Sequence, residues 1–195
     1  MRPGVLLDRD GTIIEERGYL DRLDLIAPYA WSAEAIRLLT GAGFAVVVVT
    51  NQAGVARGYF DEDFVRQAHA RLDELLCGEG AEVNGYYYCP HHPDGVVERY
   101  RRACRCRKPG PGMAESAARD LGLDLSRSFV VGDKRLDIEL AEGVGATGVL
   151  VRTGYGRHGE IALRQRRAGL VAVDTLLDAA RWIVAHSSAV PAEPR

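Results

Sequence analysis

Short apolar runs alternate along the chain with segments whose apolar residues recur at helical spacing. A continuous apolar run that ends in turn residues is typical of a strand buried on both faces of a parallel sheet. The pattern predicts strands at residues 5–7, 44–49, 85–89, 128–133, 148–151 and 170–173. Helical spacing predicts helices at residues 32–39, 61–76, 113–121, 136–141 and 175–185. Because strands that alternate with helices build right-handed crossover units, we expect an α/β fold with a central parallel sheet.

Capping residues and loops divide these elements. Ser32 and Asp61 are expected to be N-caps, because their side-chain oxygens can accept N–H groups of the first helical turn, and Gly122 is expected to end a helix. Segments in which apolar residues do not recur regularly are predicted to be loops: residues 13–29, 54–58, 89–111 and 153–156. The first of these, residues 13–29, is expected to form a small flap over the end of the first strand. The 195 residues suit one sizeable core, so we expect a single domain at 1–187 and a disordered tail at 188–195.

The charge balance narrows the range of partners. The formal net charge is −2, which gives no basic field for nucleic acid or for a membrane surface. We found no apolar run long enough to span a bilayer and no signal-type amino terminus, so a cytosolic protein is expected. Lysine occurs at only two positions among the 25 basic residues, Lys108 and Lys134, and both lie within candidate motifs.

Two carboxylates one residue apart follow the first predicted strand. Alternation along an extended chain directs Asp8 and Asp10 to the same side, at the edge where open α/β sheets bind ligands. Like charges this close repel each other, and a hard cation such as Mg²⁺ or a shared proton relieves the repulsion. One carboxylate is then expected to act as nucleophile and the other as general acid and base. For this short motif alone, the alternative is a solvated acidic turn.

Polar residues also follow two other predicted strands. Thr50 and Asn51 could hold a phosphate oxygen, or could serve only as turn residues. Asp133 is a third acid at a third strand end, with Lys134 beside it and Asp137 further on. The candidate chemistry is therefore concentrated at one edge of the sheet.

The long loop between residues 89 and 111 has no pattern that would give it a core, and a metal ion would explain its order. Cys89, His91, Cys104 and Cys106 form the Cys₃His ligand set of a structural zinc site, with His92 as a competing ligand and free thiols as the alternative. Arginines at 99, 101, 102, 105 and 107 could suggest nucleic acid, but nearby acidic residues favour a solvated loop beside an anion site.

Taken together, the motifs resemble those of the haloacid dehalogenase superfamily over nearly the whole chain. Its four signatures are similar to Leu7-Asp8-Arg9-Asp10-Gly11-Thr12, Thr50, Lys108 and Gly132-Asp133. Within it, the chain most closely resembles the heptose bisphosphate phosphatases and their sister histidinol-phosphatases. The matching stretches are DRDGTI, RGYL, VVVTNQAGVARGYF, YYYCPHHPDG, CRCRKPGPGM, VGDK and VLVRTGYG.

The resemblance implies a Rossmann-like three-layer sandwich without a large cap domain, and an aspartyl-phosphate mechanism. Asp8 would attack phosphorus, and Asp10 would protonate the leaving oxygen and then activate water. Thr50 and Lys108 would hold the transferring phosphoryl group, and Mg²⁺ would bind Asp8, Asp133 and the Asp10 carbonyl. The positions that match substrate contacts, or lie beside the metal, are Gly18, Tyr19, Asn51, Gln52, Arg107 and Lys134. The four cysteine and histidine positions match structural zinc ligands.

Two departures from the family pattern bear on specificity. Ile14 and Ala53 stand where asparagine and serine are common. These departures leave the nucleophilic residues unchanged.

From the resemblance we expect a monomeric Mg²⁺-dependent phosphatase for the 7-phosphate of a heptose 1,7-bisphosphate, with the anomer undetermined. The alternatives are a histidinol-phosphate phosphatase, a more distant DNA 3′-phosphatase, and a non-catalytic zinc-stabilised binding module. A non-catalytic module would be free to lose the catalytic signature residues, and their presence argues against it: Asp8, Asp10, Lys108 and Asp133.

Overall fold

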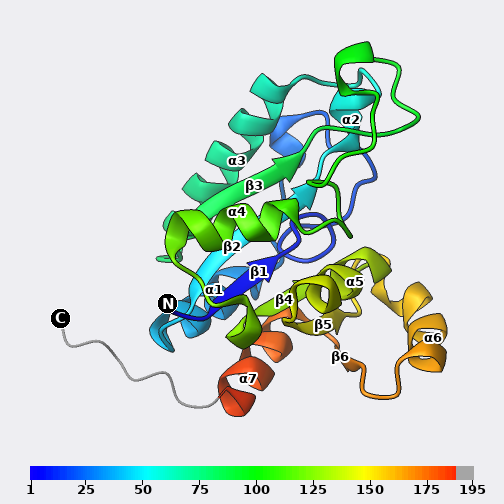
Figure 1. The fold of residues 1–195 in the computed structure, drawn as a ribbon. Coiled ribbons are helices and arrows are strands. Elements are labelled where there is room, and N and C mark those ends of the chain that lie inside the picture. The colour runs from blue at the N-terminus through cyan, green and yellow to red at the C-terminus, as the bar shows by residue number, and fades with distance from the viewer. Residues whose placement is uncertain (188–195) are drawn as a thin grey trace.

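The computed structural model describes residues 1–187, which form a six-stranded parallel sheet with the strand order β3-β2-β1-β4-β5-β6 (Figure 1). The strands are β1 (Gly4–Leu7), β2 (Ala45–Asn51), β3 (Gly85–Cys89), β4 (Phe129–Gly132), β5 (Thr147–Val151) and β6 (Val171–Val173). The predicted parallel α/β sheet is confirmed, because every neighbouring pair of strands is parallel.

Helices cover both faces of the sheet and make three layers (Figure 1). Alternation along β1 sends Val5 and Leu7 into the core beneath α1, α3 and α7, and sends Leu6 into the core beneath α4 and α5. The helices are α1 (Ser32–Gly41), α2 (Ala53–Ala56), α3 (Glu62–Cys77), α4 (Gly112–Leu121), α5 (Arg135–Val144), α6 (Gly156–Arg166) and α7 (Leu176–His186). This is the three-layer arrangement that the sequence resemblance implied.

The helix ends test the capping predictions. Asp61 caps α3, because its Oδ1 accepts the Phe64 N–H at 2.8 Å, and Gly122 ends α4 in the left-handed conformation. The prediction for Ser32 was wrong, since Trp31 occupies the N-cap position and Ser32 is the first residue of α1. Its buried hydroxyl donates instead to the Ile13 carbonyl at 2.6 Å. Ser32 thus fixes the base of the flap rather than the helix end.

Two helices occur where the sequence pattern gave none. Residues 53–56 form the single turn α2, although residues 54–58 were predicted to be a loop. Helix α6 begins at Gly156, and of its non-glycine side chains only Leu163 is buried, so the apolar stripe that would predict a helix is missing. The flap at residues 13–29 contains only the short 3₁₀ turn Leu23–Leu25, so it adds no cap domain. The predicted tail at 188–195 lies outside the described residues, and in residues 1–187 no helix is long and apolar enough to cross a membrane.

Candidate active site and metal centres

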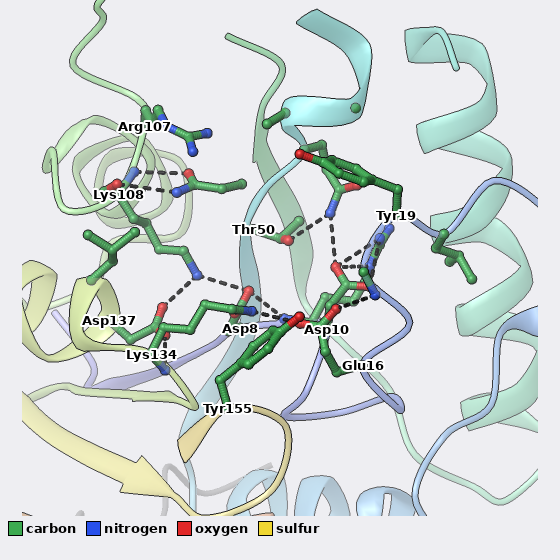
Figure 2. A pocket seen from close by; sticks show the side chains of 18 of the residues that line it. Asp8, Asp10, Glu16, Tyr19, Thr50, Arg107, Lys108, Lys134, Asp137 and Tyr155 are labelled. Atoms are coloured by element: carbon green, nitrogen blue, oxygen red, sulfur yellow. Dashed lines mark hydrogen bonds and ion pairs between the residues drawn. The ribbon is translucent and has the colours of Figure 1, made fainter. Parts of the chain in front are cut away.

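The carboxyl ends of three adjacent strands meet at one cavity of about 270 Å³ (Figure 2). Asp8 directly follows β1, Thr50 lies near the end of β2, and Asp133 directly follows β4. Because β1 lies between β2 and β4, these residues from distant parts of the sequence become neighbours. The structure therefore brings together the strand-end groups that the sequence singled out.

Asp8 lines this cavity and is buried, with 4% of its surface exposed. Its Oδ1 lies 2.9 Å from Lys108 Nζ and accepts the Arg9 N–H at 2.8 Å. Burial by itself would raise the pKa of Asp8, but the ammonium groups of Lys108 and Lys134 hold that pKa below its ordinary value. Asp8 is consequently ionised, as a nucleophile requires.

Lys108 is held from both its ends. Its ammonium lies 2.6 Å from Asp137 Oδ1 and donates to the Val49 carbonyl at 2.8 Å. Its main chain is clamped by the Asn51 amide, which accepts the Lys108 N–H at 2.9 Å and donates to the Lys108 carbonyl at 3.2 Å. Asn51 lines the cavity as expected, but its side chain positions Lys108.

The sequence pattern gave no role to Asp137, nor to Arg9 and Glu16, which also line the cavity. The Asp137 carboxylate is fully buried, and its Oδ2 accepts the Lys134 N–H at 3.0 Å. Gly132 makes this position possible, because a Cβ atom there would come within 2.2 Å of Asp137 Cγ. The sequence feature that could have pointed to Asp137 is a second aspartate soon after Asp133, in the first turn of α5.

Asp10 lies beside Asp8 and is oriented by two side chains. Arg9, which is buried, donates from Nε and Nη2 to the two carboxylate oxygens at 3.1 and 3.0 Å. Gln52 Nε2 donates to Asp10 Oδ2 at 3.1 Å and to Thr50 Oγ1 at 2.9 Å. Gln52 therefore links the candidate acid–base residue to the hydroxyl group of Thr50.

Three acidic side chains offer oxygens that converge on one point: Asp8, Asp133 and Asp137 have ligand atoms within 4.8 Å of one another. Asp133 Oδ2 accepts the Tyr155 N–H at 2.8 Å, whereas its buried Oδ1 faces the Lys134 ammonium at 3.2 Å. Burial and the nearby Asp8 charge raise the pKa of Asp133 to about 7. Hard oxygen ligands in a repelling cluster fit Mg²⁺, which relieves the repulsion.

The flap supplies a further wall of the cavity. Gly18 and Tyr19 line it, and the Tyr19 ring meets the edge of Tyr59 with centroids 4.7 Å apart. Lys134 faces the flap, with its Nζ 2.9 Å from Glu16 Oε2 and 3.2 Å from Asp133 Oδ1. Of the two sequence departures, Ala53 lines the cavity, but Ile14 is buried in the core and does not.

The zinc prediction depends on four side chains that the structure gathers into one cluster: Cys89, His91, Cys104 and Cys106. The three sulfur–sulfur distances are 3.2, 3.2 and 3.5 Å, and His91 Nδ1 lies 3.3 Å from Cys106 Sγ. Two sulfurs bound to tetrahedral zinc at about 2.3 Å lie about 3.8 Å apart, so the set fits this ion. His92 lies outside the cluster and accepts the Asp94 N–H.

The cluster joins the two ends of the loop that leads to Arg107 and Lys108. Figure 2 shows these two side chains at the cavity. Arg107 lines the cavity, its Nη1 donates to the His91 carbonyl at 3.3 Å, and within residues 1–187 its guanidinium has no carboxylate partner. Its charge is thus available to a ligand in the cavity.

A parallel α/β sheet whose strand ends carry Asp8, Thr50 and Asp133 around a buried lysine defines a haloacid dehalogenase-like hydrolase. A family model described as HAD-hydrolase-like matches residues 105–179. D-glycero-β-D-manno-heptose-1,7-bisphosphate 7-phosphatase of Photorhabdus laumondii is 46% identical over 154 residues, which cover 78% of this chain and 81% of the relative.

Two further relatives agree with this result. The phosphatase of the same name from Escherichia coli K12 is 46% identical over 154 residues, covering 78% of this chain and 80% of that protein. The crystal structure of D,D-heptose 1,7-bisphosphate phosphatase from B. bronchiseptica, complexed with magnesium and phosphate, has a TM-score of 0.83 at 33% identity, covering 94% of this chain and 98% of that one. The chain belongs to the family of the D-glycero-β-D-manno-heptose-1,7-bisphosphate 7-phosphatases, and it is a phosphatase.

Proposed function

We propose that the chain is a Mg²⁺-dependent phosphatase that hydrolyses the 7-phosphate ester of D-glycero-β-D-manno-heptose 1,7-bisphosphate. The names of the relatives supply the substrate and its anomer. The observation that carries the chemistry is the 2.9 Å approach of Lys108 Nζ to the buried Asp8 carboxylate, in a cavity that Asp10 also lines.

In this proposal Asp8 attacks the phosphorus atom, and the bond between phosphorus and the sugar oxygen breaks. Asp10 gives its proton to that oxygen, which leaves as the sugar hydroxyl, and Asp8 becomes an aspartyl phosphate. Asp10 then takes a proton from a water molecule that attacks the phosphorus and releases inorganic phosphate. Arg9 and Gln52 hold the Asp10 carboxylate for both transfers.

Charge neutralisation is the other requirement of phosphoryl transfer. Lys108 and Thr50 are placed to hold phosphoryl oxygens, since both line the cavity beside Asp8. Asp8, Asp133 and the Asp10 carbonyl would hold Mg²⁺, which supplies positive charge that orients the phosphate and stabilises the transition state.

We also propose that zinc has a structural role, bound by the Cys₃His cluster. A closed four-ligand site leaves no position for substrate, so its effect is to fix the loop that carries Arg107 and Lys108. Thiolate ligands must stay reduced, which supports a cytoplasmic location. Since all residues of the scheme come from one chain, we propose that the active form is a monomer.

We assign the second phosphate of the substrate to the guanidinium of Arg107, whose charge is not paired with a carboxylate within residues 1–187. An arginine can form paired hydrogen bonds to a phosphate, whereas histidinol phosphate has no second phosphate for it to bind. Ala53 supplies no polar group on this wall of the cavity, so it cannot favour either substrate by hydrogen bonding.

The test is a comparison of kcat/KM for phosphate release in Mg²⁺ buffer. The substrates are both anomers of D-glycero-D-manno-heptose 1,7-bisphosphate, histidinol phosphate and fructose 1,6-bisphosphate. We expect a clear preference for the β anomer. A preference for the α anomer would overturn the assigned anomer, and equal or better turnover of histidinol phosphate would overturn the heptose assignment while keeping the mechanism.

A further inference from the structure

Glu16 connects the flap to the strand-end loop that follows β4. Its Oε2 lies 2.9 Å from Lys134 Nζ, and its Oε1 accepts the Gly18 N–H at 2.8 Å. The carboxylate is well enclosed, with 12% of its side chain exposed. Figure 2 shows Glu16 and Lys134 pointing into the cavity from different segments of the chain. One side chain therefore fixes both the ammonium of Lys134 and the backbone next to Tyr19.

Lys134 lies among three carboxylates. Its Nζ is 2.9 Å from Glu16, 3.2 Å from Asp133 and 3.9 Å from Asp8. Asp8 and Asp133 belong to the converging acidic cluster, but Glu16 does not. Glu16 thus gives the ammonium a negative partner that lies outside the candidate magnesium site.

An ammonium group and a divalent cation compete for the same carboxylate oxygens and repel each other. A lysine whose only acidic partners were Asp8 and Asp133 would have to be displaced when a metal ion enters. A third carboxylate lowers that competition, because the ammonium can stay paired while the other two acids turn to the metal.

We propose that Glu16 is a positioning residue that sets the Mg²⁺ affinity of the site by keeping the Lys134 ammonium paired when Asp8 and Asp133 bind the metal. The inference rests on the metal placement proposed above. It also couples metal binding to the flap, because the same Glu16 carboxylate holds the Gly18 backbone.

The experiment measures Mg²⁺ binding without substrate. MgCl₂ is titrated at constant ionic strength into the full-length, zinc-loaded protein, and the dissociation constant is obtained from the rise in melting temperature. The variants are Glu16→Gln, Lys134→Met and the double variant, with Glu16→Asp as a conservative replacement. Gln at position 16 keeps an acceptor for the Gly18 N–H and removes only the charge. Glu15→Gln is the matched control, because Glu15 is exposed and pairs with Arg17.

Glu16→Gln is expected to weaken Mg²⁺ binding by about tenfold or more, and Glu16→Asp by less. Lys134→Met is expected to bind Mg²⁺ at least as tightly as the original chain. In the Lys134→Met background, Glu16→Gln should have a much smaller effect, since the ammonium through which it acts is gone. Glu15→Gln should leave the affinity unchanged.

An equal loss of affinity in both backgrounds would overturn the inference, because Glu16 would then act on the metal directly or on the fold. Unchanged affinity in Glu16→Gln would overturn it as well. Asp133→Asn separates this failure from a failure of the proposed function. If Asp133→Asn binds Mg²⁺ as well as the original chain, the metal placement itself is wrong.

Discussion

The Asp137 carboxylate lies 2.6 Å from the Lys108 ammonium, and both side chains are almost completely buried. The same ammonium lies 2.9 Å from Asp8. Burial by itself would lower the pKa of Lys108, but the charges of Asp137 and Asp8 raise it above its ordinary value. Lys108 is therefore a permanent cation shared between the proposed nucleophile and a second acid that holds it.

Asp137→Asn should lower kcat/KM by about 10- to 100-fold, because Lys108 would then pair with Asp8 alone and be drawn away from the phosphoryl oxygens. Asparagine still accepts the Lys134 N–H, so the start of α5 is preserved. The steady-state kinetics of phosphate release check this, with the exposed Asp24→Asn as the matched control. Unchanged kinetics in Asp137→Asn would show that this pair has no part in catalysis.

Asp8→Asn should abolish turnover, with a loss on the order of 10³-fold or more, because an amide cannot form the aspartyl phosphate. The fold should persist, since asparagine has the same size and can still accept the Arg9 N–H. Phosphate release and the melting temperature are measured together. Activity retained in a folded Asp8→Asn variant would refute the nucleophile assignment.

Arg107→Gln should raise KM for the heptose bisphosphate by about tenfold, because the second phosphate loses a charged partner. KM for a monophosphate such as histidinol phosphate should barely change. Arg105→Gln is the matched control, since Arg105 is exposed, pairs with Glu115 and does not line the cavity. An equal rise in KM for both substrates would mean that Arg107 maintains the conformation of the loop and does not bind the second phosphate.

Removal of zinc should lower the melting temperature and abolish activity, because the loop that carries Lys108 loses its ligand cluster. Cys104→Ser should have the same effect, whereas Cys77→Ser should have none, since Cys77 lies outside the cluster. Metal analysis and the melting temperature, with and without a strong chelator, provide the measurement. Native protein that contains no zinc would contradict the prediction.

His69 should make the protein less stable in acid. Its ring stacks on Tyr86 with centroids 4.6 Å apart, and burial lowers the pKa of His69 to about 3 from 6.5. Between these two pH values the unfolded chain binds a proton that the folded chain does not. The free energy of unfolding therefore falls as the pH drops below 6.5, by about 2 kcal/mol at pH 5.

His69→Phe keeps an aromatic ring against Tyr86 but cannot take up a proton. Urea unfolding of both proteins at pH 8 and pH 5 checks the prediction. The original chain should lose about 2 kcal/mol more than the variant between these two pH values. An equal loss in both proteins would show that His69 does not titrate in this way.

The sequence by itself determined the order and type of most elements and the chemistry at the strand ends. Buried parallel strands need continuous apolar runs, so β1, β2, β4 and β5 were visible as such. Asp8, Thr50 and Asp133 were identified because parallel strands all end at one edge of a sheet. The Cys₃His set was identified from residue type, and the structure brings His91, rather than His92, to the three cysteines.

Only the tertiary structure decided which side chains contact one another. Asn51 and Gln52 line the cavity, and the sequence could not show that their amides also hold Lys108 and Asp10. Asp137, which pairs with Lys108, had no assigned role. Ser32 bonds to the flap, and α6 follows a sequence with almost no apolar stripe. The physical reason is that periodicity and caps report on neighbours within a few residues, whereas these contacts depend on strand register and on packing between segments far apart in the chain.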